Sequence, residues 1–153
     1  MKKYIIIMIA TLALASCDIE SSDNGKLDGF WHLERVDTLA TGGSTDYSDQ
    51  LAFWGAQLHL ISAKDLGTGG HERYYLRFQQ TSDSLNITGA YKDHWHEDNP
   101  NEEVGGDIPV NEVNDDLRYY GINALPEGFA KERLDGSRMV LRSKTLRLTF
   151  RRF

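Results

Sequence analysis

The clearest pattern in the chain is a regular alternation of apolar and polar residues near its C-terminus. Every second side chain is apolar between residues 146 and 150, and a similar alternation covers 139–143. Alternation with a period of two places one face of a strand against a core. Asp135-Gly136 separates this region from another apolar segment, 129–134, and an Asp-Gly pair favours a tight hairpin. The C-terminal region therefore predicts three consecutive antiparallel strands.

Similar patterns recur along the rest of the chain. They predict strands within 27–36, 51–62, 72–80 and 85–91, whereas 38–49 and 65–70 are rich in Gly, Ser, Thr and Asp and predict a loop and a turn. Short strands joined by turns at this spacing favour an antiparallel sandwich or barrel.

One segment departs from this alternation. Residues 93–116 contain nine acidic residues and no Lys or Arg, which predicts a long solvated loop. Val113, Leu117 and Tyr120 then follow helical spacing, with Pro109 before them and Gly121 after. We expect one short amphipathic helix within 110–120, capped by Gly121.

The first residues resemble a bacterial lipoprotein signal. Two lysines precede an apolar run over 4–14, which is shorter than the roughly 20 residues that a membrane-spanning helix needs. Leu14-Ala15-Ser16-Cys17 resembles the lipobox. In proteins with this family of signals, the chain is cleaved before the cysteine, and the cysteine is then acylated. We expect a signal peptide over 1–16, a lipidated flexible tether over 17–26 and one domain over 27–153.

Lipidation at Cys17 has further consequences. It is the only cysteine, so its acylation excludes disulfides, thiolate zinc sites and cysteine nucleophiles. The acidic residues after it resemble the surface-export signal of Bacteroidetes lipoproteins. We expect a protein anchored in the cell envelope, in the outer membrane, facing the periplasm or the cell surface.

Composition and motifs restrict the function. The net charge of −6 repels phosphate backbones, so no nucleic-acid partner is expected. The chain contains no G-x-S-x-G, H-E-x-x-H or phosphate-binding loop motif, and we expect neither a cofactor nor an enzyme. A hydrolase that uses two carboxylates brought together by folding remains an open alternative.

His94 and His96 form the only metal-like pattern. Both side chains would lie on one side of a strand, but a third ligand has to come from the acidic segment 93–116. Exposed imidazoles beside a polar loop are the simpler interpretation. Calcium held by the loop acids is a second alternative, although the segment lacks the regular spacing of a calcium-binding loop.

Aromatic and basic residues supply the candidate ligand-lining positions. The aromatic candidates either line a barrel cavity or fill its core. The basic candidates either bind an acidic ligand or pair with acids on neighbouring strands. The candidates are Trp31, Trp54, Tyr74, Tyr91, Arg147 and Arg151.

Two three-residue segments resemble the O-glycosylation motif of Bacteroidetes envelope proteins. They are Asp37-Thr38-Leu39 and Asp83-Ser84-Leu85. The resemblance implies sugar attachment at Thr38 or Ser84.

Gly29-Phe30-Trp31 resembles the G-x-W motif that begins the first strand of lipocalins. Lipocalins also carry a late arginine that packs over this tryptophan, and Arg147, Arg151 and Arg152 are the candidates. Segments at both ends of the domain resemble small lipocalin-like lipoproteins of Bacteroidetes. Thr45-Asp46-Tyr47 spells another lipocalin motif, but directly after the first strand rather than late in the barrel, so we treat it as coincidence.

The resemblance implies an all-β, antiparallel lipocalin-like barrel with one short helix. The leading functional prediction is a lipoprotein that binds a small apolar or amphipathic ligand in the barrel without catalysis. The alternative is an envelope protein–protein interaction module with a filled barrel core. In that case the acidic segment and the basic C-terminal hairpin would contact a partner protein.

Overall fold

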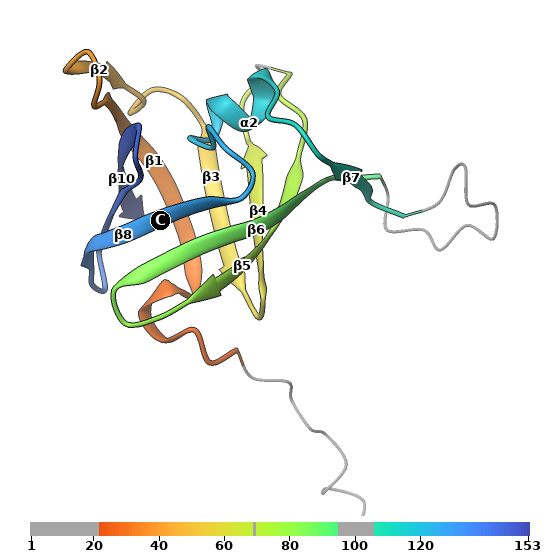
Figure 1. Ribbon diagram of the computed structural model, residues 1–153, viewed down its shortest axis with the longest axis horizontal. Helices are drawn as coiled ribbons and strands as arrows, with labels where there is room; N and C mark the ends of the chain where they lie inside the picture. Colours follow the sequence, from red (N-terminus) through yellow and green to blue (C-terminus); the bar gives the residue numbers. More distant parts are fainter. Residues whose placement is uncertain (1–21, 69, 95–105) are drawn as a thin grey trace, which may run out of the picture.

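The computed structural model describes residues 22–68, 70–94 and 106–153. Eight antiparallel strands form a closed ring in these residues (Figure 1). Around the ring they are β1 (Gly29–Thr38), β3 (Ala52–Gln57), β4 (Leu60–Asp65), β5 (Tyr74–Gln80), β6 (Ser84–Lys92), β8 (Glu127–Leu134), β9 (Arg138–Arg142) and β10 (Leu146–Arg152).

The ring closes where the last strand pairs with the first. Leu33 lies opposite Phe150, and Thr38 lies opposite Leu146, with a bulge between Leu33 and Arg35. Closure gives both potential edge strands a partner, which a sheet of this length needs to avoid edge-to-edge association. The predicted antiparallel barrel is therefore confirmed.

Four smaller elements lie outside the eight-stranded ring. A 3-10 turn, η1 (Gly25–Leu27), precedes β1, and β2 (Gly43–Asp46) adds to the outer part of β1. β7 (Ile108–Val110) pairs with the end of β6, and α2 (Asp115–Tyr119) follows it. No helix among the described residues is long and apolar enough to cross a membrane.

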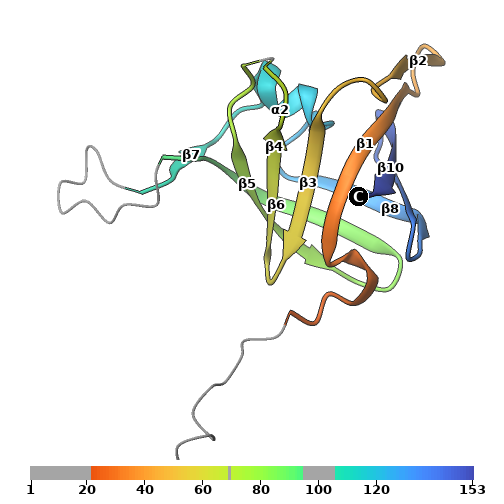
Figure 2. The ribbon, with the colours of Figure 1, turned by 180° about the vertical axis from the view of Figure 1, so that it is seen from behind.

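The two ends of the barrel differ, and we name them by what they carry. The mouth end carries α2, the β1–β2 hairpin and the β4–β5 loop, whereas the tether end carries η1 and the β3–β4 and β5–β6 turns (Figures 1 and 2). The described chain starts at the tether end.

Large side chains fill the interior of the barrel. Alternate residues of each strand point inward, as the period of a strand requires. The bulkiest buried side chains come from strands all around the ring and from the segment after α2, and each is at most 2% exposed: Trp31, Trp54, Tyr74, Tyr120, Phe129 and Phe150. The interior is a packed core of a small barrel.

The segment around α2 closes the mouth end over this core. Leu117, Tyr120 and Ile122 are fully buried, and the Trp54 indole Nε1 donates a hydrogen bond to the Tyr120 carbonyl at 3.1 Å. Gly121 ends the helix at φ +85°, with its N–H bonded to the Arg118 carbonyl. The predicted glycine cap is confirmed.

Two local predictions were wrong. The segment 51–62 is not one strand, because the chain reverses at Leu58 between β3 and β4 without the usual Gly or Asn. The loop predicted over 38–49 contains β2. The short helix predicted within 110–120 is confirmed as α2. It begins at Asp115, where the Asn114 side chain caps it by accepting from the Leu117 N–H at 2.9 Å.

Candidate functional site

Three of the predicted ligand-lining residues lie inside the barrel. Trp31, Trp54 and Tyr74 belong to the packed core, and each is at most 2% exposed. The Trp31 Nε1 donates to the Leu27 carbonyl at 2.8 Å, so its polar atom is also satisfied. These side chains belong to the core cluster that fills the interior.

The other three lie on the outer face of the sheet. Tyr91 packs under the Arg77 guanidinium, whose central carbon is 5.3 Å from the ring centroid. Arg147 pairs with Glu132 at 2.6 Å, and Arg151 pairs with Glu34 at 2.6 Å. The six candidates therefore do not converge on one site. Arg151 links β10 to its neighbour β1, and Arg147 links β10 to β8 across β9.

The predicted metal and lipid positions are only partly described. The His94 backbone N–H donates to an Asp107 carboxylate oxygen at 3.2 Å, whereas His96 and Cys17 lie outside the described residues. Within the described parts of the chain, no group of three or more His, Cys, Asp or Glu side chains is placed to hold a metal ion.

A pocket of about 520 Å³ lies at the mouth end, beside the helix that closes the barrel. Leu51 and Leu66 are 42% and 49% exposed, so the pocket offers apolar surface directly to solvent. The lining residues come from the segment before β3, from the end of β4 with the loop after it, and from α2: Asp49, Gln50, Leu51, Asp65, Leu66, Gly67, Thr68, His71 and Tyr119. We call this the mouth pocket.

His71 and Tyr119 form one wall of the mouth pocket. Their rings stack with centroids 3.6 Å apart and planes within 9°. The His71 Nδ1 is 2.9 Å from an Asp116 carboxylate oxygen, which fixes the rotation of the imidazole. Tyr47 packs against the Tyr119 ring at 5.7 Å, so the wall is held from behind.

A hydrogen-bond network attaches this wall to the barrel. The Tyr74 hydroxyl donates to the second Asp116 oxygen at 3.4 Å and accepts from the Asn114 amide at 2.8 Å. The Tyr120 hydroxyl donates to the Glu72 carbonyl at 2.9 Å. Residues that cap α2 and residues that orient His71 therefore belong to one network, which preorganises the pocket.

The phenol at this wall is partly buried. Burial and the nearby Asp65 charge raise the pKa of Tyr119 to about 12. Tyr119 therefore remains an uncharged phenol over the whole physiological range, and its apolar ring is available to pack against a ligand.

The mouth pocket combines apolar and acidic side chains. Leu51, Leu66 and Tyr119 supply apolar contact, and Asp49 and Asp65 supply negative charge. The Asp116–His71 pair resembles the orienting pair of a hydrolase. However, no hydroxyl within the described residues hydrogen-bonds to the His71 ring, as the nucleophile of such a hydrolase would.

The family model of lipocalin-like domains matches residues 12–153. This chain belongs to the lipocalin-like domain family. It is similar in structure to a lipocalin-like protein from Bacteroides uniformis, with a TM-score of 0.57 and 21% identity over 84% of this chain and 100% of that one. It is also similar in structure to an uncharacterised protein from Bacteroides eggerthii. That match has a TM-score of 0.58 and 19% identity over 82% of this chain and 98% of that one. No curated protein matches the chain.

The lipocalin-like motif at the start of β1 is visible in the structure. Among the three arginines predicted to pack over Trp31, Arg152 does so, at 5.3 Å from the ring centroid. Arg147 and Arg151 instead pair with acids on the outer face.

Sequence reasoning missed the mouth pocket of this lipocalin-like domain. His71 lies beside a segment that predicted only a turn, and Asp116 lies in a segment that predicted a solvated loop. The available signal was the aromatic pair Tyr119-Tyr120 directly before the helix-ending Gly121. One ring of such a pair fills the core while the other faces outward, and here Tyr119 faces the pocket.

Proposed function

We propose that this protein is a cell-envelope lipoprotein, anchored at Cys17, that binds a small amphipathic ligand at the mouth of its barrel without catalysing a reaction. The observation that carries the proposal is the mouth pocket of about 520 Å³. Its volume falls in the range of small-molecule sites, roughly 300–1,000 Å³.

The filled interior supports the mouth rather than the barrel core as the binding position. Side chains that a ligand would have to displace, such as Trp54 and Phe129, are at most 1% exposed and pack edge to face at 6.3 Å. Removing such contacts is costly, about 3–5 kcal/mol for a large aromatic side chain. A ligand at the mouth pocket leaves this core intact.

The lining residues define the chemistry of the ligand. Leu51, Leu66 and the Tyr119 ring favour an apolar portion, and Asp49 and Asp65 favour a group that donates hydrogen bonds or carries positive charge. The ligand class proposed is therefore a small amphipathic molecule with a donor or cationic group at one end.

The envelope location is supported by the first residues of the chain. The lysine pair, the apolar run over 4–14 and Leu14-Ala15-Ser16-Cys17 occur in the order and spacing of a lipoprotein signal. Two or three acyl chains on Cys17 give stable anchoring, because each buried CH₂ contributes about 0.8 kcal/mol.

Native mass spectrometry tests the proposal. The full-length protein is purified from its own envelope, and its native mass is compared with its mass after denaturation. We expect a non-covalent excess of one small molecule, together with a covalent mass increase from acylation of Cys17. A native mass equal to the denatured mass would argue against ligand binding.

A second candidate function is supported by the same packed interior. A barrel filled by side chains suits an interaction module whose outer surface contacts another envelope protein. Crosslinking in intact cells distinguishes the two: one partner recovered in the absence of a bound small molecule would favour this candidate.

A further inference from the structure

The chain enters the barrel beside the β3–β4 turn. The Leu58 N–H donates to the Ser22 hydroxyl at 2.8 Å, and the Asn24 amide donates to the Leu58 carbonyl. The Gln80 amide from the β5–β6 turn reaches the Asn24 carbonyl at 3.3 Å. The point where residues 17–21 join the described chain is therefore fixed at the tether end.

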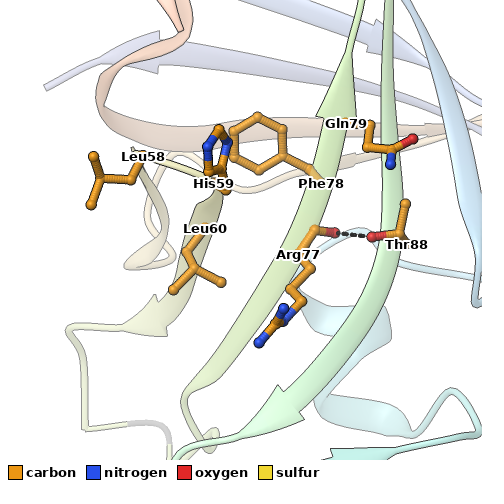
Figure 3. A pocket seen from close by; sticks show the side chains of 7 residues that line it. All are labelled: Leu58, His59, Leu60, Arg77, Phe78, Gln79 and Thr88. Atoms are coloured by element: carbon orange, nitrogen blue, oxygen red, sulfur yellow. Dashed lines mark hydrogen bonds between the residues drawn. The ribbon is translucent and has the colours of Figure 1, made fainter. Parts of the chain in front are cut away.

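A groove of about 440 Å³ opens on the outer face next to this point (Figure 3). Leu58, His59 and Leu60 from the β3–β4 turn form one side, and Arg77, Gln79 and Thr88 from β5 and β6 form the other. Leu60 is 41% exposed. We call this surface the tether groove.

The turn that forms the tether groove carries an unusual residue. Leu58 has φ +52°, and it is the only residue other than glycine with positive φ in the described chain. An L-residue in this conformation costs about 1–2 kcal/mol, so Gly or Asn is the default here. The turn instead places a half-buried aliphatic side chain against the groove.

Arg77 gives the groove a positive charge. Its guanidinium stacks over Tyr91, and it forms no ion pair with any described residue. Arg147 and Arg151, by contrast, each pair with a carboxylate at 2.6 Å. Arg77 is exposed to solvent, and its planar fork suits a phosphate.

The length of chain between the groove and the lipid is short. Five residues, 18–22, follow Cys17 up to the hydrogen bond with Leu58. At about 3.3–3.6 Å per residue, the greatest span is about 18 Å. An acylated Cys17 therefore keeps Leu58 within the thickness of one headgroup layer and the adjacent water.

We propose that the tether groove is a membrane-docking surface, in which Leu58 and Leu60 enter the headgroup region and Arg77 binds lipid phosphates. The inference rests on the lipid anchor at Cys17 that the proposed function includes. Docking of this surface holds the tether end against the bilayer and points the mouth pocket away from the bilayer. The partner is a phospholipid bilayer, which supplies both phosphate and apolar surface in the arrangement that the groove presents.

Site-directed spin labelling tests the orientation with the full-length protein. The lipidated chain is reconstituted into vesicles of phosphatidylethanolamine and phosphatidylglycerol, and a nitroxide is attached at Leu60→Cys or, as a control, at Ala40→Cys near the mouth end. We expect the label at position 60 to be accessible to oxygen and shielded from a water-soluble nickel chelate. The label at position 40 should show full exposure to the chelate.

Two further comparisons separate the possible failures. The parental chain should take up no label, because acylation blocks Cys17; labelling of that chain would overturn both the anchor and the docking surface. If the parental chain takes up no label but the label at position 60 is exposed to the chelate, the docking surface alone is overturned.

The phosphate contact is tested by two further variants that carry the label at position 60. Arg77→Gln should raise the exposure of that label to the chelate, whereas Arg118→Gln on α2 should not. Equal effects of the two substitutions would contradict the phosphate contact.

Discussion

Arg152 covers the Trp31 ring at the point where the barrel closes. Its guanidinium carbon is 5.3 Å from the ring centroid, and its Nη2 donates to the Asp28 carbonyl at 2.6 Å. Gly29 lies beneath this contact at φ +135°, where an added Cβ would be 2.6 Å from the same Nη2. The glycine and the tryptophan of the G-x-W motif thus serve one contact: the glycine makes room for the arginine that covers the tryptophan.

Arg152→Met should destabilise the barrel by about 1–3 kcal/mol. It removes the cation–π contact and leaves the Asp28 carbonyl without its charged donor. Urea denaturation of the full-length protein measures the change. Arg118→Gln is the matched control, because its exposed ion pair with Asp115 should contribute less than about 0.5 kcal/mol. Equal losses in the two variants would contradict the role of Arg152.

Gly121→Ala should cost about 2–4 kcal/mol. The residue has φ +85°, and a Cβ would lie 2.8 Å from both Leu148 methyl carbons, so the substitution combines backbone strain with overpacking. Gly136→Ala provides the control, since nothing lies within 4 Å of its added Cβ and its φ is not positive. Thermal unfolding should show a large loss for the first variant and almost none for the second.

The sequence predicted the barrel because its strongest signals are local. Alternation over 139–143 and 146–150, joined by Asp135-Gly136 to the preceding strand, specifies three of the strands that the structure confirms. The β3–β4 turn was not predicted, because Leu58 adopts the left-handed conformation that Gly or Asn usually signals in a sequence. Its periodicity continues across the turn, and the two strands therefore look like one.

Trp54→Phe should destabilise the closed mouth end by about 1–3 kcal/mol. The indole Nε1 is the side-chain donor to the Tyr120 carbonyl at 3.1 Å, and its loss leaves a buried acceptor unsatisfied. Chemical denaturation measures the effect, and Tyr91→Phe on the outer face serves as the control with an expected change within about 0.5 kcal/mol. If both variants unfold at the same urea concentration, the bond does not hold the segment after α2.

Acid should weaken the seam between β1 and the last two strands. Burial raises the pKa of Glu34, but hydrogen bonds from Arg151 and Arg138 outweigh it and hold the pKa below the ordinary 4.5. A carboxylate with a lowered pKa stabilises the fold above its unfolded pKa, and this contribution is lost as the pH falls through the folded value.

The measurement is the free energy of unfolding as the pH is lowered from neutral to below 4. Glu34→Gln should flatten this dependence, because the titrating group is gone. Glu112→Gln, at an exposed position in the loop before α2, should retain the slope of the natural protein. An unchanged slope in Glu34→Gln would show that other carboxylates account for the acid response.

The candidate site could not be predicted in the same way as the fold. His71, Asp116 and Tyr119 are brought together by the closure of the barrel and by the position of α2, and the His71–Asp116 contact joins residues 45 positions apart. No local pattern encodes such a contact. The predicted aromatic candidates Trp31, Trp54 and Tyr74 instead carry the alternation signal, which is a signal for the core.

The most direct test of ligand binding at the mouth compares three forms of the full-length protein taken from the same envelope. Native mass spectrometry measures the bound mass in the natural protein, in Tyr119→Ala, which removes one wall of the mouth pocket, and in Tyr91→Ala on the outer face. We predict a non-covalent mass excess in the natural protein and in Tyr91→Ala, and its loss in Tyr119→Ala. An excess that persists unchanged in Tyr119→Ala, or its absence from the natural protein, would contradict ligand binding at the mouth.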